Sequence, residues 1–227
     1  ARTNPPLALA RLRGRNQLTE IGEQELRFTL AEAAAFLKQT MGLALAPEDI
    51  ASLEARTEGW VAGLQLAALS MRGRADPGNF VRQFSGSHRH ILDYLTDEVL
   101  NRQPIDIQHF LLQTSILDRL TASLCAAVTR RQDSQVILER LERDHLFVVP
   151  LDDERRCYRY HQLFSDQLRY RLQATMPEKV SELHLLACEW HAAQGRLYEA
   201  IGHALAAKSY DRAVELIEAA DPTLAMR

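Results

Sequence analysis

The sequence predicts a mainly α-helical chain, with a helical bundle, a winged helix containing one small β-hairpin, and the start of a tetratricopeptide-like helical superhelix. Three observations support this fold class. Apolar residues recur at helical spacing almost throughout; two short β-favouring runs flank a charged turn; and short helices with small residues at their crossings end the chain. We therefore expect a bundle at 28–103, a winged helix at 104–176 and helical repeats at 177–227.

Helix-start signals define the predicted bundle. Thr29 and Glu32 form a capping-box pattern, in which the Thr side chain accepts from a first-turn amide and the Glu reaches back. Pro47 suits the first position of a further helix. The segment Gly59–Met71 is apolar on all sides, which predicts a buried helix. A last helix ends before Pro104.

The next block combines helices with a hairpin. Leu146–Pro150 and Cys157–Tyr160 favour extended structure and are joined by the charged turn LDDER. A helix is expected from His161 onward. Helices are also expected before the hairpin, at about 105–114, 121–129 and 134–144. Three helices, a hairpin and a helix are typical of a winged helix, that is, a helix-turn-helix with an added wing.

Both ends of the chain suggest continuation. After 177, apolar faces define three helices separated at Gly195 and at Lys208-Ser209. One repeat and a fraction is too little for a stable array, so we expect the solenoid to continue. Gln17–Ile21 is a candidate short strand, the remnant of a sheet domain. The absence of an initiator Met is expected of a cut inside a longer protein.

Composition excludes several classes of protein. The chain has 227 residues and a net charge of −3, so no global field attracts it to nucleic acid or an anionic membrane. Its three cysteines are far apart and odd in number, which argues against a disulfide framework and favours a reducing compartment. No apolar run approaches the ~20 residues of a membrane span. We therefore expect a cytoplasmic protein without membrane contact.

The sequence contains no constellation of catalytic or metal-binding residues. No Gly-Lys-Ser/Thr is present, so the chain lacks the P-loop that cradles a nucleoside triphosphate. C-x-x-C, H-E-x-x-H and G-x-S-x-G are also absent. His88-Arg-His90 is interpreted as a chance pair, and Asp152-Asp153 as a solvated hairpin tip. We expect no catalytic residue, no metal and no enzyme activity in this chain.

The third helix of the predicted winged helix is unsuited to DNA. A helix that enters a DNA groove meets phosphates and needs net positive charge. The segment DSQVILERLERDH is instead net acidic, because it contains Asp133, Glu139, Glu142 and Asp144 against Arg140 and Arg143. We therefore expect no direct nucleic-acid contact by this segment and interpret the winged helix as an internal packing module.

With these pieces in order, the chain resembles the middle of the MalT-like, LuxR-family ATP-dependent transcriptional regulators, which belong to the signal-transduction ATPases with numerous domains (STAND). The stretches that carry the resemblance are ARTNPPLALARLRGRNQL, RFTLAEAAAFL, ARTEGWVAGLQLAALS, FLLQTSILDRL, LFVVPLDDERRCYRYHQLF and EAIGHALAAKSYDRAVELI. In such regulators an ATPase sheet domain precedes a helical domain and a winged helix. A superhelix that senses an inducer and a DNA-binding helix-turn-helix follow.

The resemblance implies how the parts are distributed. Residues 1–27 would be the tail end of a nucleotide-binding α/β domain. The rest of that ATPase domain, the sensor and the helix-turn-helix would lie outside this chain as its partners in the same protein. Signal transduction would then involve ATP or ADP in the full-length protein, with self-association on activation. No cofactor is expected in this segment alone.

The resemblance also implies candidate nucleotide contacts near the start of the chain and in the bundle. Arg2 resembles the arginine that senses the terminal phosphate, a role that suits the forked donors of a guanidinium; the alternative is a surface arginine. Gly59-Trp60-Val61 matches the Gly-x-Pro segment that lies against adenine, with Val61 replacing the proline. Close helix packing at Gly59 and Gly63 is the alternative reading.

His161 is the third candidate. The run YHQLF resembles the methionine-histidine-aspartate motif, whose histidine contacts the β-phosphate of bound ADP. A histidine at a helix start lies beside free backbone donors and can add another donor to an anion. A capping or core histidine is the alternative.

Two functions follow as hypotheses. The first is the regulatory middle segment of an ATP-dependent, inducer-responsive transcriptional activator, which closes over bound nucleotide and relays its state to the sensor and DNA-binding parts. The parent protein would be a slow ATPase switch. The second is a helical-repeat protein–protein interaction scaffold with no nucleotide role.

Overall fold

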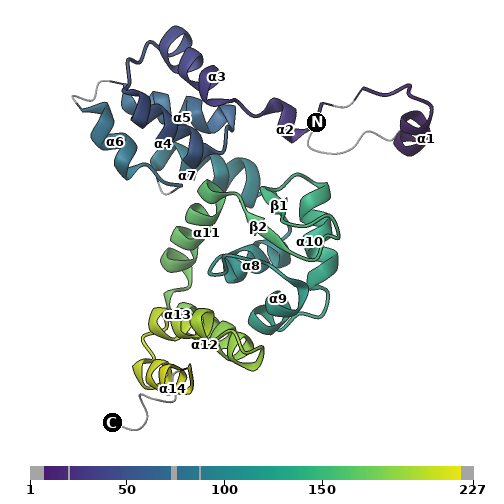
Figure 1. Ribbon diagram of the computed structural model, residues 1–227, viewed down its shortest axis with the longest axis vertical. Coiled ribbons are helices and arrows are strands. Elements are labelled where there is room, and N and C mark those ends of the chain that lie inside the picture. Colours follow the sequence, from purple (N-terminus) through teal and green to yellow (C-terminus); the bar gives the residue numbers. More distant parts are fainter. Residues whose placement is uncertain (1–7, 20, 73–75, 87, 221–227) are drawn as a thin grey trace. The chain divides into compact units, whose positions relative to one another are not determined.

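The computed structural model describes residues 8–19, 21–72, 76–86 and 88–220 (Figure 1). The predicted fold class is confirmed, because these residues are mainly helical and contain one two-stranded antiparallel sheet. The chain folds into two compact units. Of the described residues, those up to 102, 143–145 and 161–167 form the first unit, and 103–142, 146–160 and those from 168 onward form the second.

The first unit is a helical bundle with an apolar core. Its fully buried side chains include Leu37, Leu53, Leu64, Phe84 and Ile91. Its elements are α1 (Leu9–Gly14), α2 (Glu23–Leu26), α3 (Leu30–Ala35), η1 (Phe36–Thr40), α4 (Pro47–Thr57), α5 (Val61–Met71), α6 (Pro77–Gln83), α7 (Arg89–Leu95) and η2 (Thr96–Leu100). The labels η1 and η2 denote short π-helical segments.

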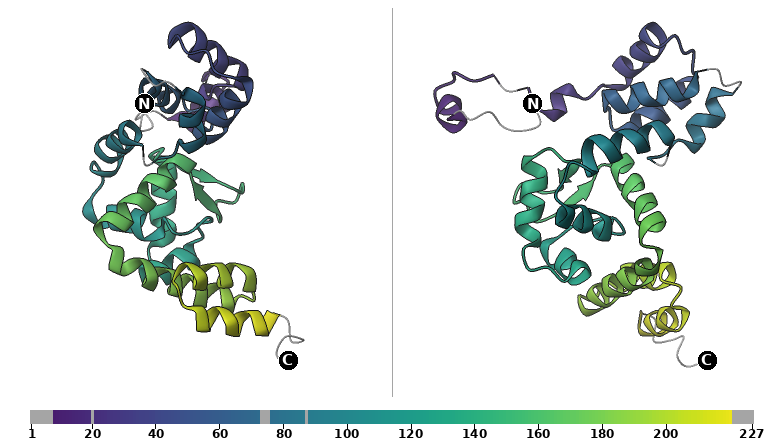
Figure 2. Two further views of the ribbon diagram at one scale, coloured as in Figure 1. Left: turned by 90° about the vertical axis from the view of Figure 1, so that its left-hand side faces the viewer. Right: turned by 180° about the vertical axis from the view of Figure 1, so that it is seen from behind.

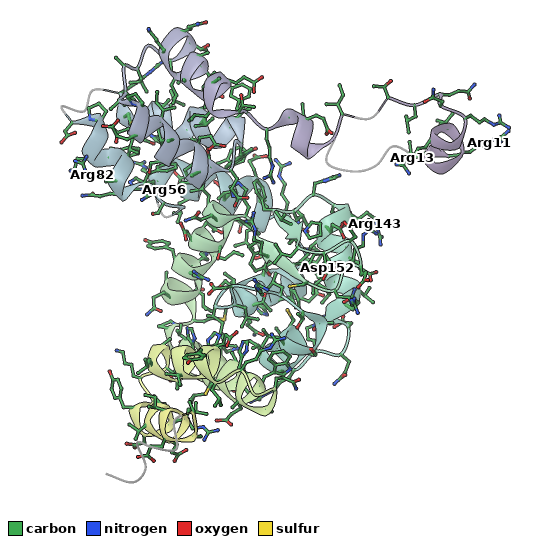
Figure 3. The ribbon with its side chains drawn as sticks, in the orientation of Figure 1. Arg11, Arg13, Arg56, Arg82, Arg143 and Asp152 are labelled. Carbon is green, nitrogen blue, oxygen red and sulfur yellow. The ribbon has the colours of Figure 1, made fainter. Side chains whose placement is uncertain are left out.

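The helix starts predicted from sequence are confirmed. Thr29 Oγ1 accepts from the Glu32 amide at 3.3 Å, and the Glu32 carboxylate accepts from the Thr29 amide at 2.9 Å, so both halves of the capping box form. Pro47 begins α4. Figure 3 labels Arg56 on α4 and Arg82 on α6, and the Arg56 guanidinium donates to the Arg82 carbonyl at 3.1 Å, which joins the two helices.

Helix α5 departs from the prediction on one side. Leu64, Ala67 and Met71 are buried, whereas Leu69 is 38% exposed. The helix packs against α4, α7 and η1, and these neighbours leave the face of Leu69 uncovered. The prediction of a helix buried on all sides is therefore wrong at this residue.

The second unit contains the hairpin and the helices that surround it. Val148 pairs with Tyr160 and Pro150 with Tyr158, and Leu120 forms a further bridge to Tyr158. The elements are α8 (Ile105–Thr114), α9 (Ala122–Thr129), α10 (Ser134–Arg143), β1 (Val148–Pro150), β2 (Tyr158–Tyr160), α11 (Gln162–Thr175), α12 (Pro177–Ala193), α13 (Leu197–Ala206) and α14 (Tyr210–Ala220). The first residues of α11 belong to the first unit.

The last three helices pack in succession, α12 on α13 and α13 on α14, as Figure 2 shows from two further sides. Their shared core contains Ala200, Ala204 and Leu216. Left-handed residues end two of the helices, Gly195 at φ 71° and Lys208 at φ 59°. The breaks predicted from sequence are thus confirmed, while the tetratricopeptide-like reading of these helices stays a prediction.

The strand predicted at Gln17–Ile21 is wrong for the described part of that segment. Gln17 donates its amide to the Leu12 carbonyl at 3.0 Å, so it closes the end of α1 instead of a sheet. Extended structure needs a partner strand for its amides, and β1 and β2 are the strands found in the described residues. Ile21 is accordingly 68% exposed.

Candidate functional site

The candidate site lies where strand β2 passes into helix α11, and His161 is at its centre. The side chain is only 3% exposed. Its Nε2 lies 2.9 Å from the carbonyl oxygen of Thr57 at the end of α4, and since a carbonyl only accepts, the ring donates. The imidazole also meets the ring of Trp60 edge-on, with centroids 6.1 Å apart.

The turn between α4 and α5 is held in an unusual conformation. Glu58 and Gly59 are both left-handed, with φ of 50° and 71°. A left-handed glutamate is strained by about 1 kcal/mol or more, and its contacts hold it in place. The Glu58 carboxylate accepts from the Gln162 amide at 3.0 Å and lies 3.7 Å from the Arg27 guanidinium. A negative charge therefore occupies the positive end of the α11 dipole.

The glycines of this turn allow close packing. A Cβ on Gly59 would lie 2.6 Å from the Phe28 carbonyl oxygen, and the Phe28 amide donates to the Gly59 carbonyl at 2.9 Å. A Cβ on Gly63 would lie 2.5 Å from the Trp60 ring. The alternative reading of these glycines, close packing at a helix start, has direct geometric support.

The structure therefore brings together three of the candidate residues, Gly59, Trp60 and His161, from positions about a hundred residues apart. Val61 follows as the first residue of α5 and is partly buried. Arg2 lies outside the described residues. The roles of these residues toward a nucleotide stay predictions.

Sequence reasoning missed the residues that close the junction. Thr57 and Glu58 contact His161 and Gln162 across 104 positions, and no local pattern signals such a pair. The only sequence signal is an acidic residue directly before Gly59, which reads as an ordinary helix end.

Helix α11 is also held from a second side. The Gly86 amide donates to the Asp166 carboxylate at 3.4 Å. Gln167 is fully buried and donates from its side-chain amide to the Thr96 hydroxyl at 3.0 Å. The first two turns of α11 are thus fixed to the bundle by polar contacts, so the orientation of His161 depends on the bundle.

An acidic residue of helix α10 contacts the hairpin of the second unit. Glu142 accepts from the Tyr158 hydroxyl at 3.4 Å and lies 3.3 Å from the Arg155 guanidinium. Burial, aided by the Glu142 charge, raises the pKa of Tyr158 to about 12, so the phenol stays a donor. Asp152, labelled in Figure 3, accepts from the Arg156 amide at 2.8 Å in the hairpin turn. Carboxylates on α10 and the hairpin thus support the wing.

The part of the chain that the structure describes contains neither a metal-binding cluster nor a membrane-spanning helix. It brings together no group of three or more His, Cys, Asp or Glu side chains able to hold a metal ion. None of its helices is both long and apolar enough to span a bilayer.

These features define the class. A hairpin flanked by α8, α9, α10 and α11 is a winged helix, and residues 96–180 match the family described as "MalT winged helix domain". Residues 96–180 therefore form a winged helix domain of the MalT type.

Particular relatives extend the likeness beyond that domain. The chain is 39% identical over 212 residues to the serine/threonine-protein kinase PknK of Mycobacterium tuberculosis, covering 93% of this chain and 19% of that protein. It is 39% identical over 209 residues to the HTH-type transcriptional regulator MalT of Klebsiella pneumoniae, covering 91% and 23%. It is also 34% identical over 221 residues to MalT of Vibrio parahaemolyticus, which covers 96% of this chain and 24% of that protein. The chain thus spans between about a fifth and a quarter of the length of these relatives.

Proposed function

We propose that this chain is the regulatory middle segment of an ATP-dependent, inducer-responsive transcriptional activator. It closes over ATP or ADP held by another part of the same protein and relays the nucleotide state to sensor and DNA-binding parts. The similarity to MalT regulators supports the transcriptional setting. The observation that carries the nucleotide role is the meeting of His161 with Thr57 and Trp60 at the start of α11.

The chemistry of this junction suits an anion. The N-terminus of a long helix presents backbone N–H groups and a positive dipole end, which favour phosphate. Glu58 now occupies one of these amides. A β-phosphate would take its place beside Gln162, because a dianion is the stronger acceptor and would also attract Arg27.

His161 would change partners in the same step. One ring N–H is engaged by the Thr57 carbonyl. The ring can donate to phosphate either by leaving Thr57 or by carrying protons on both nitrogens, and a nearby dianion favours the protonated form. Since the side chain is 3% exposed, both routes require the junction to open.

The switch would then be an equilibrium between two packings of the junction. ADP would favour the packing in which α11 is held over the nucleotide, and inducer with ATP would favour the released one. Each ligand can shift this balance only by its difference in affinity for the two packings. Release would permit self-association and promoter binding by parts outside this chain, and the parent would hydrolyse ATP slowly.

The regulatory role fits the range of relatives. A similar segment occurs in a protein named as a transcriptional regulator and in one named as a serine/threonine-protein kinase. A segment shared by two such different outputs is better explained by regulation than by catalysis. We therefore assign no enzyme activity to the segment itself.

The test uses the full-length protein. Replacing His161 by Ala should raise transcription in the absence of inducer, because the closed packing loses its contact. Replacing the exposed His90 on α7 by Ala is the matched control and should leave basal transcription unchanged. Basal transcription equal in H161A and the parent protein would contradict the proposal.

An interaction scaffold without a nucleotide role is the second candidate. It is favoured by the apolar side chains left open on α13 and α14, where Tyr198 is 87% exposed, Tyr210 64% and Val214 52%. Such faces bind further helices or partners. The sequence that precedes this segment in the parent separates the two: G-x-x-x-x-G-K-[ST] supports the nucleotide switch, and helical repeats support the scaffold.

A further inference from the structure

A cavity of about 910 Å³ lies within the second unit. Its walls come from the α8–α9 connection, the end of the hairpin turn, α11, α12 and α13. This volume is in the range of sites for small organic ligands. The junction around His161 belongs to the first unit, so none of its residues lines this cavity.

Basic side chains dominate the charge of this cavity. Among the described residues its lining contains four arginines, Arg119, Arg156, Arg169 and Arg196, but only two carboxylates, Asp118 and Glu199. The lining therefore has a net positive charge even when all of its histidines are neutral.

Two of the four arginines are engaged in hydrogen bonds or ion pairs with other protein groups, and the other two form no ion pair among the described residues. Arg169 donates to the Ser115 carbonyl and to Asp118, each at 2.7 Å, and Arg156 pairs with Glu154. Within the described part of the chain, Arg119 and Arg196 form no ion pair with a carboxylate. Arg196 lies instead over the Trp190 ring, 5.6 Å from its centroid.

Three histidines form the inner wall between α12 and α13. The Nδ1 atoms of His184 and His203 are 2.8 Å apart, so one ring donates and the other accepts. The ring that accepts, if neutral, has its hydrogen on Nε2. His191 stacks on His203 with centroids 5.4 Å apart and planes at 17°. Its side chain is 7% exposed, and its buried Nδ1 has no hydrogen-bond partner.

The surroundings of the three histidines favour their neutral form. Burial lowers the pKa of all three, and the neighbouring His184 and His191 help lower that of His203 to about 4. The charged groups that act on them are Arg169 and Asp118 for His203, and Arg196 and Glu199 for His191. An incoming negative charge would oppose these effects and allow a histidine to take up a proton.

We propose that this cavity binds a small phosphorylated metabolite, with Arg119 and Arg196 contacting the phosphate and the histidine wall supplying further ring N–H donors. A guanidinium group can donate two parallel hydrogen bonds to the oxygens of one phosphate. The buried Nδ1 of His191, which has no hydrogen-bond partner, is a polar atom that a ligand would satisfy. The volume exceeds that of phosphate alone, so the rest of the cavity accommodates an organic group. The ligand would bridge the winged helix to α12 and α13.

The experiment uses the 227-residue chain and inorganic phosphate at constant ionic strength. Binding is followed by the NMR signals of the imidazole rings of His184, His191 and His203. We expect saturable shifts at these rings. R119Q and R196Q each remove one charge-assisted contact and should weaken phosphate binding about tenfold. R171Q is the matched control, because Arg171 is on α11 next to the lining but outside it.

Three results would overturn the proposal. They are ring signals that do not respond to phosphate, an equal loss of affinity in R171Q and R196Q, and tighter binding of citrate than of phosphate. Circular dichroism of each variant confirms that the fold is retained, and both Arg119 and Arg196 are exposed enough to be replaced without disturbing the core.

Discussion

Replacing Gly59 by Ala tests why a glycine is needed beside the candidate site. Gly59 and Gly42 provide a matched pair, because both belong to the first unit and have φ near 70°. A Cβ on Gly42 would meet nothing within 4 Å, whereas a Cβ on Gly59 would lie 2.6 Å from the Phe28 carbonyl oxygen. Left-handed strain and unfolded-chain entropy are therefore common to both variants, and steric contact is specific to Gly59.

The expected difference in stability follows from the contacts of Phe28 that a Cβ on Gly59 would disturb. The Phe28 carbonyl would have to retreat by about 0.8 Å to reach an ordinary contact distance. That movement disturbs the 2.9 Å hydrogen bond from its amide to Gly59, which contributes about 1 kcal/mol. It also disturbs the edge-on contact of the Phe28 and Phe36 rings, 5.7 Å apart, which contributes about 0.5–1.5 kcal/mol. We expect G59A to be less stable than G42A by about 1–2 kcal/mol.

The assay is urea unfolding followed by tryptophan fluorescence. The chain contains two tryptophans, and replacing Trp190 by Phe in both variants leaves Trp60 as the reporter of the first unit. The comparison needs no nucleotide. Unfolding free energies that agree within about 0.5 kcal/mol would refute the packing explanation for Gly59.

Three further predictions follow from single contacts. E58Q keeps an acceptor for the Gln162 amide but removes the charge at the start of α11, so unfolding of the first unit should become easier by about 0.5–1 kcal/mol in urea; an unchanged midpoint would contradict the role of the charge. Y160F removes the 2.7 Å hydrogen bond between buried Tyr160 and Thr114 and should cost about 1–2 kcal/mol, whereas Y170F, at a residue 51% exposed, should be neutral; equal losses would argue against that bond. Folding lowers the pKa of His203 from 6.5 to about 4. Between these pH values the unfolded chain binds more protons than the folded chain, so the free energy of unfolding of the second unit should fall by about 1–2 kcal/mol as pH falls from 7 to 4. H203Q should flatten this dependence in pH-resolved denaturation, and an identical slope would exclude the histidine wall as its cause.

Local signals in the sequence predicted local structure well. The capping box at Thr29, the proline at the start of α4 and the charged turn between the strands each act within a few residues, and each forms as expected. The candidate strand at Gln17 failed because a strand depends on a partner elsewhere.

The candidate site could be predicted only in part. The resemblance singled out His161, Gly59 and Trp60, which do meet, but the bonds that fix them come from Thr57 and Glu58 across 104 positions. Such contacts depend on tertiary packing, for which one sequence gives no signal.

The histidine wall was missed for a different reason. His184 and His191 are seven positions apart and so share a face of α12, but two histidines at helical spacing give no signal for a third ring that comes from another helix. Only the packing of α13, which adds His203, makes the three rings a cluster.

The rate at which ADP leaves the full-length protein tests the central claim most directly. His161 is proposed to hold the phosphate, while the contacts of Asp166 and Gln167 with the bundle hold the start of α11 in place. We predict faster release of ADP from H161A than from H90A or the unaltered protein, with equal thermal stability in the absence of nucleotide for the last two. An ADP dissociation rate that is unchanged in H161A would contradict the account.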